Sequence, residues 1–92
     1  MVEINKDFIK KFQAEKKKKD FEIIFNFYAP KIKSVLVRNG ADVTLAEDIM
    51  HDTMINIWDK IHLYNPEKGS FSSWIYTIAR NNRIDLLRKK SS

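Results

Sequence analysis

The sequence predicts an all-α protein, a small bundle of about four to five helices. Only two Gly and two Pro interrupt the 92 residues, and these residue types most often end regular structure. Apolar residues recur at helical spacing along nearly the whole chain, as in amphipathic helices that share one core. Hydrophobic residues make up 43% and charged residues 32%, a balance typical of a folded domain. The length suits one small domain, residues 1–92.

Residues 3–19 are expected to form the first helix, with apolar side chains on one side. This helix would end in the four lysines Lys16–Lys19. Cations at a helix C-terminus interact favourably with the partial negative charge there. A solvated helix end is therefore the first interpretation of the lysine run, and a nucleic-acid patch is the alternative.

The second helical segment is expected to begin at Asp20, whose carboxylate can act as an N-cap. Pro30 should kink or break this segment, because proline lacks an amide donor and clashes with the preceding turn. Residues 31–38 should then continue as a helix. Asn39 and Gly40 are expected to end it, since a helix C-terminus often needs a left-handed residue.

The third helix is expected over residues 44–61, where Thr44 and Glu47 have the spacing of a capping box. One broad arc of this helix is apolar and should face the core. Its opposite side carries what we call the acidic ridge, Asp48, Asp52, Asn56 and Asp59, flanked by Ile49 and Ile55. Carboxylates at this spacing repel one another, so a cationic partner would explain the ridge. An ordinary acidic surface is the alternative, but exposed isoleucines favour a docking face.

The last helix should run from Ser70 to Lys90, because Ser70 can cap it and no Pro or Gly follows. One arc is apolar and is expected to face the core: Phe71, Trp74, Ile75, Ile78 and Ala79. Asn82 and Asp85 continue this arc, so a structural role is expected for them. The opposite side is basic and aromatic, with Tyr76, Arg80, Arg83 and Leu87. This composition is typical of nucleic-acid binding, and a solvated face is the alternative.

The charge is unevenly distributed along the chain. Residues 1–38 hold ten Lys or Arg and five Asp or Glu, and residues 67–92 hold six and two. Residues 39–66 between them hold one Lys and five Asp or Glu. An acidic centre between two basic flanks predicts two surfaces with different partners.

Catalysis, metals and cofactors are not expected. The chain has no Cys, and its two histidines, His51 and His62, lack a third ligand. Residues 64–70 contain one Gly, too few for a phosphate-binding loop. No window has the apolar length of a signal peptide or a membrane span, so a cytoplasmic protein is expected.

From about Phe21 to Lys90 the chain resembles region 2 of sigma factors of the sigma-70 family, of the extracytoplasmic-function (ECF) type. The resemblance lies in several short motifs in the right order and spacing. They are Ala46-Glu47-Asp48 leading to Trp58, Gly69-Ser70-Phe71 with Trp74, Ile78-Ala79-Arg80-Asn81, and Asp85-Leu86-Leu87-Arg88. Many relatives carry Gln-Glu where this chain has His51-Asp52.

The resemblance implies a non-enzymatic transcription initiation factor domain with two binding surfaces. The coiled coil of the RNA polymerase β′ subunit would bind at Asp48, Asp52, Asn56, Ile49 and Ile55. The promoter −10 element would be melted, and its single-stranded non-template strand held, by Tyr64, Asn65, Lys68, Ser70, Ser73, Tyr76, Arg80, Asn81, Arg83 and Arg88. Base identity is expected to be read by the loop from Asn65 to Ser70, with Asn81 as a second reader.

Two other functions are weighed beside this one. The first is a sigma-like interaction module held by an anti-sigma factor, without promoter recognition of its own. The second is a basic helix-turn-helix protein, which would not account for the acidic ridge. Complete ECF factors also carry region 4, which reads the −35 element and is absent from this chain. Residues 89–92 resemble the start of a linker, so an excised domain is expected.

Overall fold

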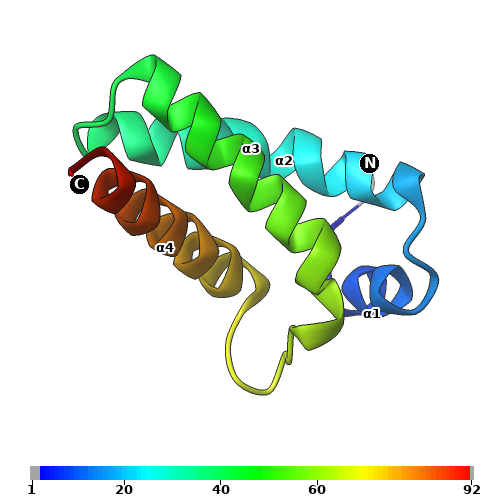
Figure 1. Cartoon of the computed structure of the whole chain (residues 1–92). Helices are drawn as coiled ribbons and strands as arrows, with labels where there is room; N and C mark the ends of the chain where they lie inside the picture. The colour runs from blue at the N-terminus through cyan, green and yellow to red at the C-terminus, as the bar shows by residue number, and fades with distance from the viewer. Residues whose placement is uncertain (1–2, 92) are drawn as a thin grey trace.

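The computed structural model describes residues 3–91 and contains the helices α1 (Lys6–Glu15), α2 (Lys18–Arg38), α3 (Val43–Lys60) and α4 (Phe71–Ser91). A short 3-10 helix, η1 (Ile61–Leu63), extends the end of α3. Helix α3 packs on both α2 and α4, and α1 lies across one end of the bundle (Figure 1). The expected all-α bundle of four to five helices is confirmed.

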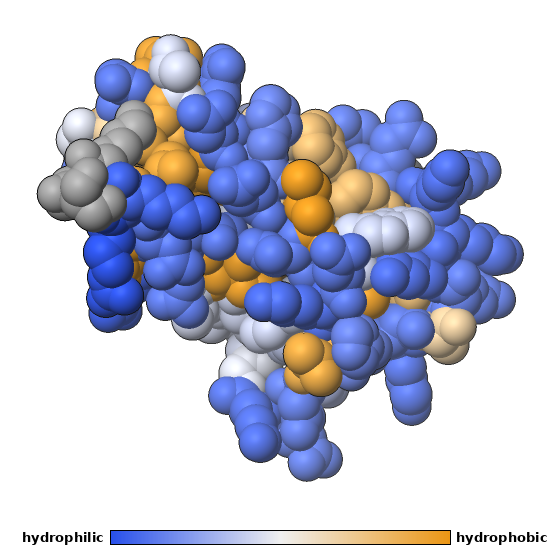
Figure 2. Space-filling view, viewed as in Figure 1, coloured by the Kyte–Doolittle hydropathy of each residue, from blue (hydrophilic) through white to orange (hydrophobic). Residues whose placement is uncertain are grey.

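One hydrophobic core joins all four α-helices. Helix α3 lies at its centre and buries residues along most of its length, among them Ala46, Ile49, Met50, Thr53, Met54 and Ile57. The surface seen in Figure 2 is mainly hydrophilic, with separate hydrophobic patches between the charged side chains. The central position of α3 matters for function, because its remaining exposed side is the acidic ridge.

The first helix does not extend to Lys19 as predicted, and only Lys16, as its C-cap, lies at its end. The interpretation of the run as a helix C-terminus is wrong for Lys18 and Lys19, which begin α2. Helix α1 ends at Glu15 without a basic residue in its last turn, and Lys16 adopts a left-handed conformation with φ 48°. Helix α2 begins at Lys18, and its N-cap residue Lys17 makes no side-chain capping bond. The chain turns here because Phe12 of α1 then stacks on Phe21 of α2, with ring centroids 6.2 Å apart.

Asp20 does not cap α2, contrary to the prediction. It lies inside the first turn of the helix and is only 9% exposed. The predicted break before Pro30 is also wrong, because α2 continues through this residue as one helix of 21 residues. A proline inside a helix costs about 3 kcal/mol. The buried residues on either side of it, Ala29 and Ile32, hold both halves of α2 on the core and offset that cost.

The end of α2 is as predicted. Asn39 is the C-cap, and Gly40 has a φ of 98°, which glycine adopts without strain. The amide of Ala41 donates to the carbonyl oxygen of Leu36 at 3.0 Å. This bond satisfies a carbonyl at the end of the helix.

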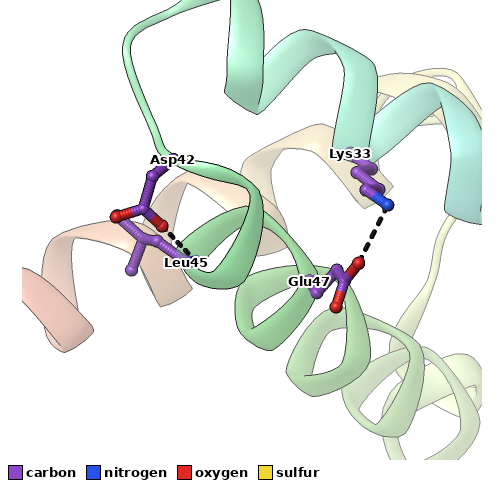
Figure 3. A network of polar contacts seen from close by, with 4 residues as sticks. All are labelled: Lys33, Asp42, Leu45 and Glu47. Carbon is purple, nitrogen blue, oxygen red and sulfur yellow. Dashed lines mark hydrogen bonds and ion pairs between the residues drawn. The ribbon is translucent and has the colours of Figure 1, made fainter.

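The N-cap of helix α3 lies two residues earlier than the capping box predicts. Asp42 is the N-cap, and its Oδ1 accepts a hydrogen bond from the amide of Leu45 at 2.8 Å (Figure 3). Glu47 does not reach back to Thr44, because it accepts a hydrogen bond from Lys33 of α2 at 2.9 Å (Figure 3). The predicted capping box is therefore wrong, and its glutamate joins α2 to α3 instead.

Replacement of the two candidate caps should separate these alternatives. Asp42→Ala is expected to lower the free energy of unfolding by about 1 kcal/mol, since it leaves an amide at the helix N-terminus without its acceptor. The matched control Thr44→Ala should change it by less than about 0.5 kcal/mol, because Thr44 is an exposed residue inside the first turn. Urea denaturation followed by circular dichroism measures both. A larger loss for Thr44→Ala would contradict the observed cap.

Candidate functional site

The acidic ridge lies on the side of α3 that neither α2 nor α4 covers. Asp48, Asp52 and Asp59 are all exposed, and none of them forms an ion pair with a residue that the structure describes. Ile55, also on this side, is 58% exposed, as predicted. The ridge therefore combines unpaired carboxylates with an exposed apolar side chain.

Two residues that the sequence places on the ridge side, Ile49 and Asn56, are less exposed than Asp48, Asp52 and Asp59. Ile49 is 0% exposed and belongs to the core, so the prediction that it is an exposed docking residue is wrong. Because α3 is covered from two directions, its buried arc is wider than a stripe facing one neighbour. Asn56 is half-buried, and its Oδ1 accepts a hydrogen bond from Nδ2 of Asn82 at 2.9 Å.

Asn82 has the structural role that the sequence predicts. Its Nδ2 also lies 3.2 Å from Oγ1 of Thr53, which is fully buried in α3. This side chain thus joins α4 to two positions of α3. A buried amide that lost these partners would be costly, so Asn82 positions the surface of α4 relative to that of α3.

The loop between η1 and α4 is closed from inside by Tyr64. This residue is 8% exposed, and its hydroxyl donates to the carbonyl oxygen of Gly69 at 2.9 Å. Its ring packs against Phe71 and Trp74 at centroid distances of 5.3 and 5.4 Å. Burial raises the pKa of the Tyr64 hydroxyl. Tyr64 therefore shapes the loop, and its buried ring is not free to stack on a base.

Two further sets of hydrogen bonds hold the loop in place. Gln13 of α1 donates from Nε2 to the carbonyl oxygens of Ile61 and Tyr64, at 3.0 and 2.8 Å. Within the loop, Oδ1 of Asn65 accepts from the amide of Glu67 at 2.9 Å. The loop is thus tied both to α1 and to itself.

A hollow of about 260 Å³, which we call the loop hollow, opens between this loop and the start of α4. Asn65, Lys68, Ser70 and Ser73 from the predicted set line it, together with Trp74 and Thr77. Ser70 is the N-terminal cap of α4, as predicted, and its Oγ accepts from the amide of Ser73 at 3.1 Å. An amide side chain, an ammonium group and hydroxyls therefore converge beside an aromatic ring.

The remaining predicted DNA-binding residues lie along α4 on two sides. Tyr76, Arg80 and Arg83 line one groove of about 470 Å³ between α4 and α2, as their shared side in the sequence predicts, and Arg80 is the exposed one of the three. Asn81 and Arg88 line a separate hollow of about 480 Å³ on the α3 side. The structure thus brings together five predicted residues at the loop hollow, Tyr64, Asn65, Lys68, Ser70 and Ser73, and divides the other predicted residues of α4 between two surfaces.

Two of these α4 residues are less free than the sequence predicts. Nη2 of Arg83 donates to the backbone oxygen of Asn39 at 3.0 Å, so this arginine already contacts the end of α2. Tyr76 is half-buried, and burial is the main cause that raises the pKa of its hydroxyl; Tyr28 adds to this rise and Arg38 opposes it. Arg80 makes no such contact and is the most accessible of the three.

Trp74 and Thr77 also line the loop hollow, although neither belongs to the predicted DNA-binding set. Trp74 is half-buried, and its ring both packs on the core and lines the hollow. Thr77 is exposed one turn after Ser73 and donates from Oγ1 to the Ser73 carbonyl oxygen at 2.8 Å. The recurrence of small polar residues at 70, 73 and 77 is the signal that could have identified this side of α4.

In the part of the chain that the structure describes, no three His, Asp or Glu side chains come together to hold a metal ion. No helix over the same residues is both long and apolar enough to cross a membrane.

The chain is similar to several known proteins over most of its length. The Sigma-70 region 2 family model matches residues 24–92. The ECF RNA polymerase sigma factor RpoE of Cereibacter sphaeroides is 45% identical over 69 residues, which are 75% of this chain and 38% of that protein. The ECF RNA polymerase sigma factor SigW of Bacillus subtilis is 36% identical over 85 residues, 89% of this chain and 45% of that protein.

The fold is also found in a solved structure, that of Rhodobacter sphaeroides SigE in complex with the anti-sigma ChrR. It superposes with a TM-score of 0.84 at 37% identity, over 90% of this chain and 51% of that chain. The chain thus spans about half or less of the length of these relatives. The extent of the family match and the identity of these relatives confirm the resemblance, and the chain belongs to the Sigma-70 region 2 family, among the ECF sigma factors.

Proposed function

We propose that this domain docks on RNA polymerase core through the acidic ridge and recognises and melts the promoter −10 element with the loop hollow and α4. The observation that carries the proposal is the placement of two unlike surfaces on one rigid bundle. Unpaired carboxylates line α3, and amide, hydroxyl and cationic groups line the loop and α4. One scaffold can therefore hold a protein and a nucleic acid at the same time. Such a domain would act in the cytoplasm, where the polymerase is.

The docking surface consists of Asp48, Asp52 and Ile55. Exposed carboxylates at helical spacing suit a basic face of the β′ coiled coil, and Ile55 supplies apolar area beside them. Asn56 lies at the edge of this surface, and Ile49 supports it from the core.

The loop hollow suits an extruded base of the non-template strand. Melting a duplex costs a few kcal/mol per unstacked base, so a protein that captures the strand needs groups that pair with a base edge. Asn65 and Ser73 supply such groups, and Lys68 supplies a cation for the backbone. Arg80 and Arg88, both exposed on α4, would contact phosphates beyond the hollow.

Holding by an anti-sigma factor is the second candidate function, since the SigE neighbour is in complex with the anti-sigma ChrR. Strand preference separates promoter recognition from simple duplex binding. The 92-residue chain should bind a single-stranded −10 non-template oligonucleotide more tightly than the duplex, whereas a helix-turn-helix reader prefers duplex. Fluorescence anisotropy measures both affinities. Tighter duplex binding, or no DNA binding together with no core binding, would overturn the proposal.

Exchange of the loop between Asn65 and Ser70 for that of a related factor should change which −10 bases are preferred. The hollow supplies the groups that contact a base edge, whereas α4 contributes cations that contact any phosphate. A panel of single-stranded oligonucleotides with single base changes measures the preference, and a polymerase pull-down is the control. Unaltered preference would show that the loop is only a connector.

Arg80→Ala should lower affinity for the single strand and reduce the log-log salt slope by about 0.7, as expected for one lost phosphate contact. Arg83→Ala should have a smaller effect on the slope, because Arg83 already donates to Asn39. Anisotropy titrations at several salt concentrations measure both variants. Equal slopes for Arg80→Ala and the unmodified chain would remove Arg80 from the DNA surface.

A further inference from the structure

A second aromatic surface lies at the C-terminal end of α3. There the turn between α1 and α2 packs against Trp58. We call it the aromatic–lysine cluster and define it as Phe21, Phe25 and Trp58 with Lys16 and Lys18. The rings of Phe21 and Trp58 meet edge to face at 5.2 Å, and Phe25 lies 6.4 Å from Phe21. All three rings are half-buried, so part of each remains accessible.

The rings of the cluster line a hollow of about 430 Å³, together with Lys18 and Glu22. The right-hand side of Figure 2, over the start of α2 and the end of α3, is mostly hydrophilic, with small less polar areas between the charged side chains. The volume lies within the range of small-ligand pockets. This surface is therefore large enough for a flat aromatic group.

Two of the lysines near these rings, Lys18 and Lys19, have no structural explanation in their own helix. Lys18 and Lys19 lie in the first turn of α2, where the helix dipole disfavours cations. Neither forms an ion pair with a residue in the described part of the chain, whereas Lys17 lies 3.8 Å from Glu15. Lys18 and Lys19 thus place positive charge beside the hollow, next to Glu22, which also lines it, and Asp20 in the same turn.

Lys16 is the C-cap of α1, where a left-handed residue is common, and its amide donates to the carbonyl oxygen of Phe12. It has the left-handed φ of 48°, which Gly or Asn adopts more easily. In this conformation its Nζ lies 4.7 Å from the centre of the Trp58 ring. A lysine side chain is long and flexible, so the ammonium can move from the ring to a nearby phosphate.

The cluster belongs to the same end of the molecule as the loop hollow. Trp58 precedes Ile61 by one helical turn, and Gln13 of α1 donates to the backbone oxygens of both Ile61 and Tyr64. Helix α1 thus ties the end of α3 to the start of the loop. A strand held in the loop hollow has a second aromatic and cationic surface within the same part of the fold.

We propose that the aromatic–lysine cluster is a second binding site for single-stranded DNA, in which a base stacks on the exposed rings and the lysines contact its phosphates. Accessible aromatic faces beside cations are the two components of sequence-tolerant single-strand binding. The proposal rests on the proposed function, because it extends the strand beyond the loop hollow. A protein partner with an acidic surface is the competing occupant.

The two tryptophans allow the sites to be tested separately. Trp58 lines the cluster and Trp74 lines the loop hollow. Trp74→Phe leaves Trp58 as the only tryptophan, and Trp58→Phe leaves Trp74. Circular dichroism first confirms the fold of each variant. Titration with oligothymidylate should then quench the tryptophan fluorescence of both variants, because a stacked base quenches the ring that it covers. Quenching of Trp74 alone would overturn this inference and leave the proposed function standing, and quenching of neither would overturn both.

A pair of lysine variants tests the inference without changing the core. Lys16→Gln with Lys18→Gln should lower oligothymidylate affinity by about tenfold or more near 0.1 M salt and reduce the salt slope by about 1.4. The matched control, Lys6→Gln with Lys10→Gln, removes the same charge from exposed positions of α1. It should change affinity much less. An equal loss in both variants, or none in the first, would overturn the inference.

Discussion

Replacement of Asp48 and Asp52 by Arg is expected to abolish binding to RNA polymerase core while leaving the fold intact. Both carboxylates are exposed and without an ion-pair partner in the described structure, so they contribute little to folding. In a docked complex, loss of one partner of a desolvated charge pair costs about 2 to 5 kcal/mol, and reversal adds repulsion. A pull-down with polymerase core measures binding, and thermal denaturation measures stability.

The matched control for this double variant is Glu15→Arg with Glu22→Arg. It exchanges two exposed carboxylates for arginines on α1 and α2, so the change in net charge is the same. Core binding should persist in the control. Undiminished binding of the ridge variant, or an equal loss in both, would exclude the ridge as the docking surface.

Ile49→Ala is expected to lower the free energy of unfolding by about 2 to 5 kcal/mol, although Ile49 lies beside the acidic ridge in sequence. Its side chain is fully buried in the core, so truncation leaves a cavity. Ile55→Ala is the matched comparison, because the same truncation at a 58% exposed position removes little buried area. It should change stability by less than about 0.5 kcal/mol and weaken polymerase binding.

Chemical denaturation of both variants measures these two stabilities on one scale, and a pull-down measures their binding. Similar stabilities would contradict the packing of α3 observed here. Full polymerase binding by Ile55→Ala would show that this exposed isoleucine lies outside the docking surface.

The sequence predicted the existence of the helices and several of their ends. Ser70 caps α4, and Asn39 with Gly40 ends α2, because these signals act through neighbouring backbone groups. The N-cap of α3 was predicted at Thr44, but it is Asp42. Both residue types cap helices, and the choice depends on where the chain leaves the preceding turn.

The candidate site was predictable in composition but not in exposure. Periodicity placed Ile49 and Ile55 as equal flanks of the ridge, but only Ile55 is exposed. Tyr64 and Tyr76 are both polar aromatics that sequence assigned to DNA, yet one is buried under the loop and the other is half-buried in a groove against α2. The periodicity of one helix does not reveal how many neighbours cover it.

The sequence by itself determined the all-α class, the separation of acidic and basic segments, and the motifs that identify the family. These properties depend on residue types and their spacing, which are local. Only the tertiary structure decided that α2 continues through Pro30 and that the lysine run surrounds aromatic rings at the turn between α1 and α2. The physical reason is that both outcomes depend on burial against segments distant in the chain, where packing outweighs the local preference of a proline or a lysine.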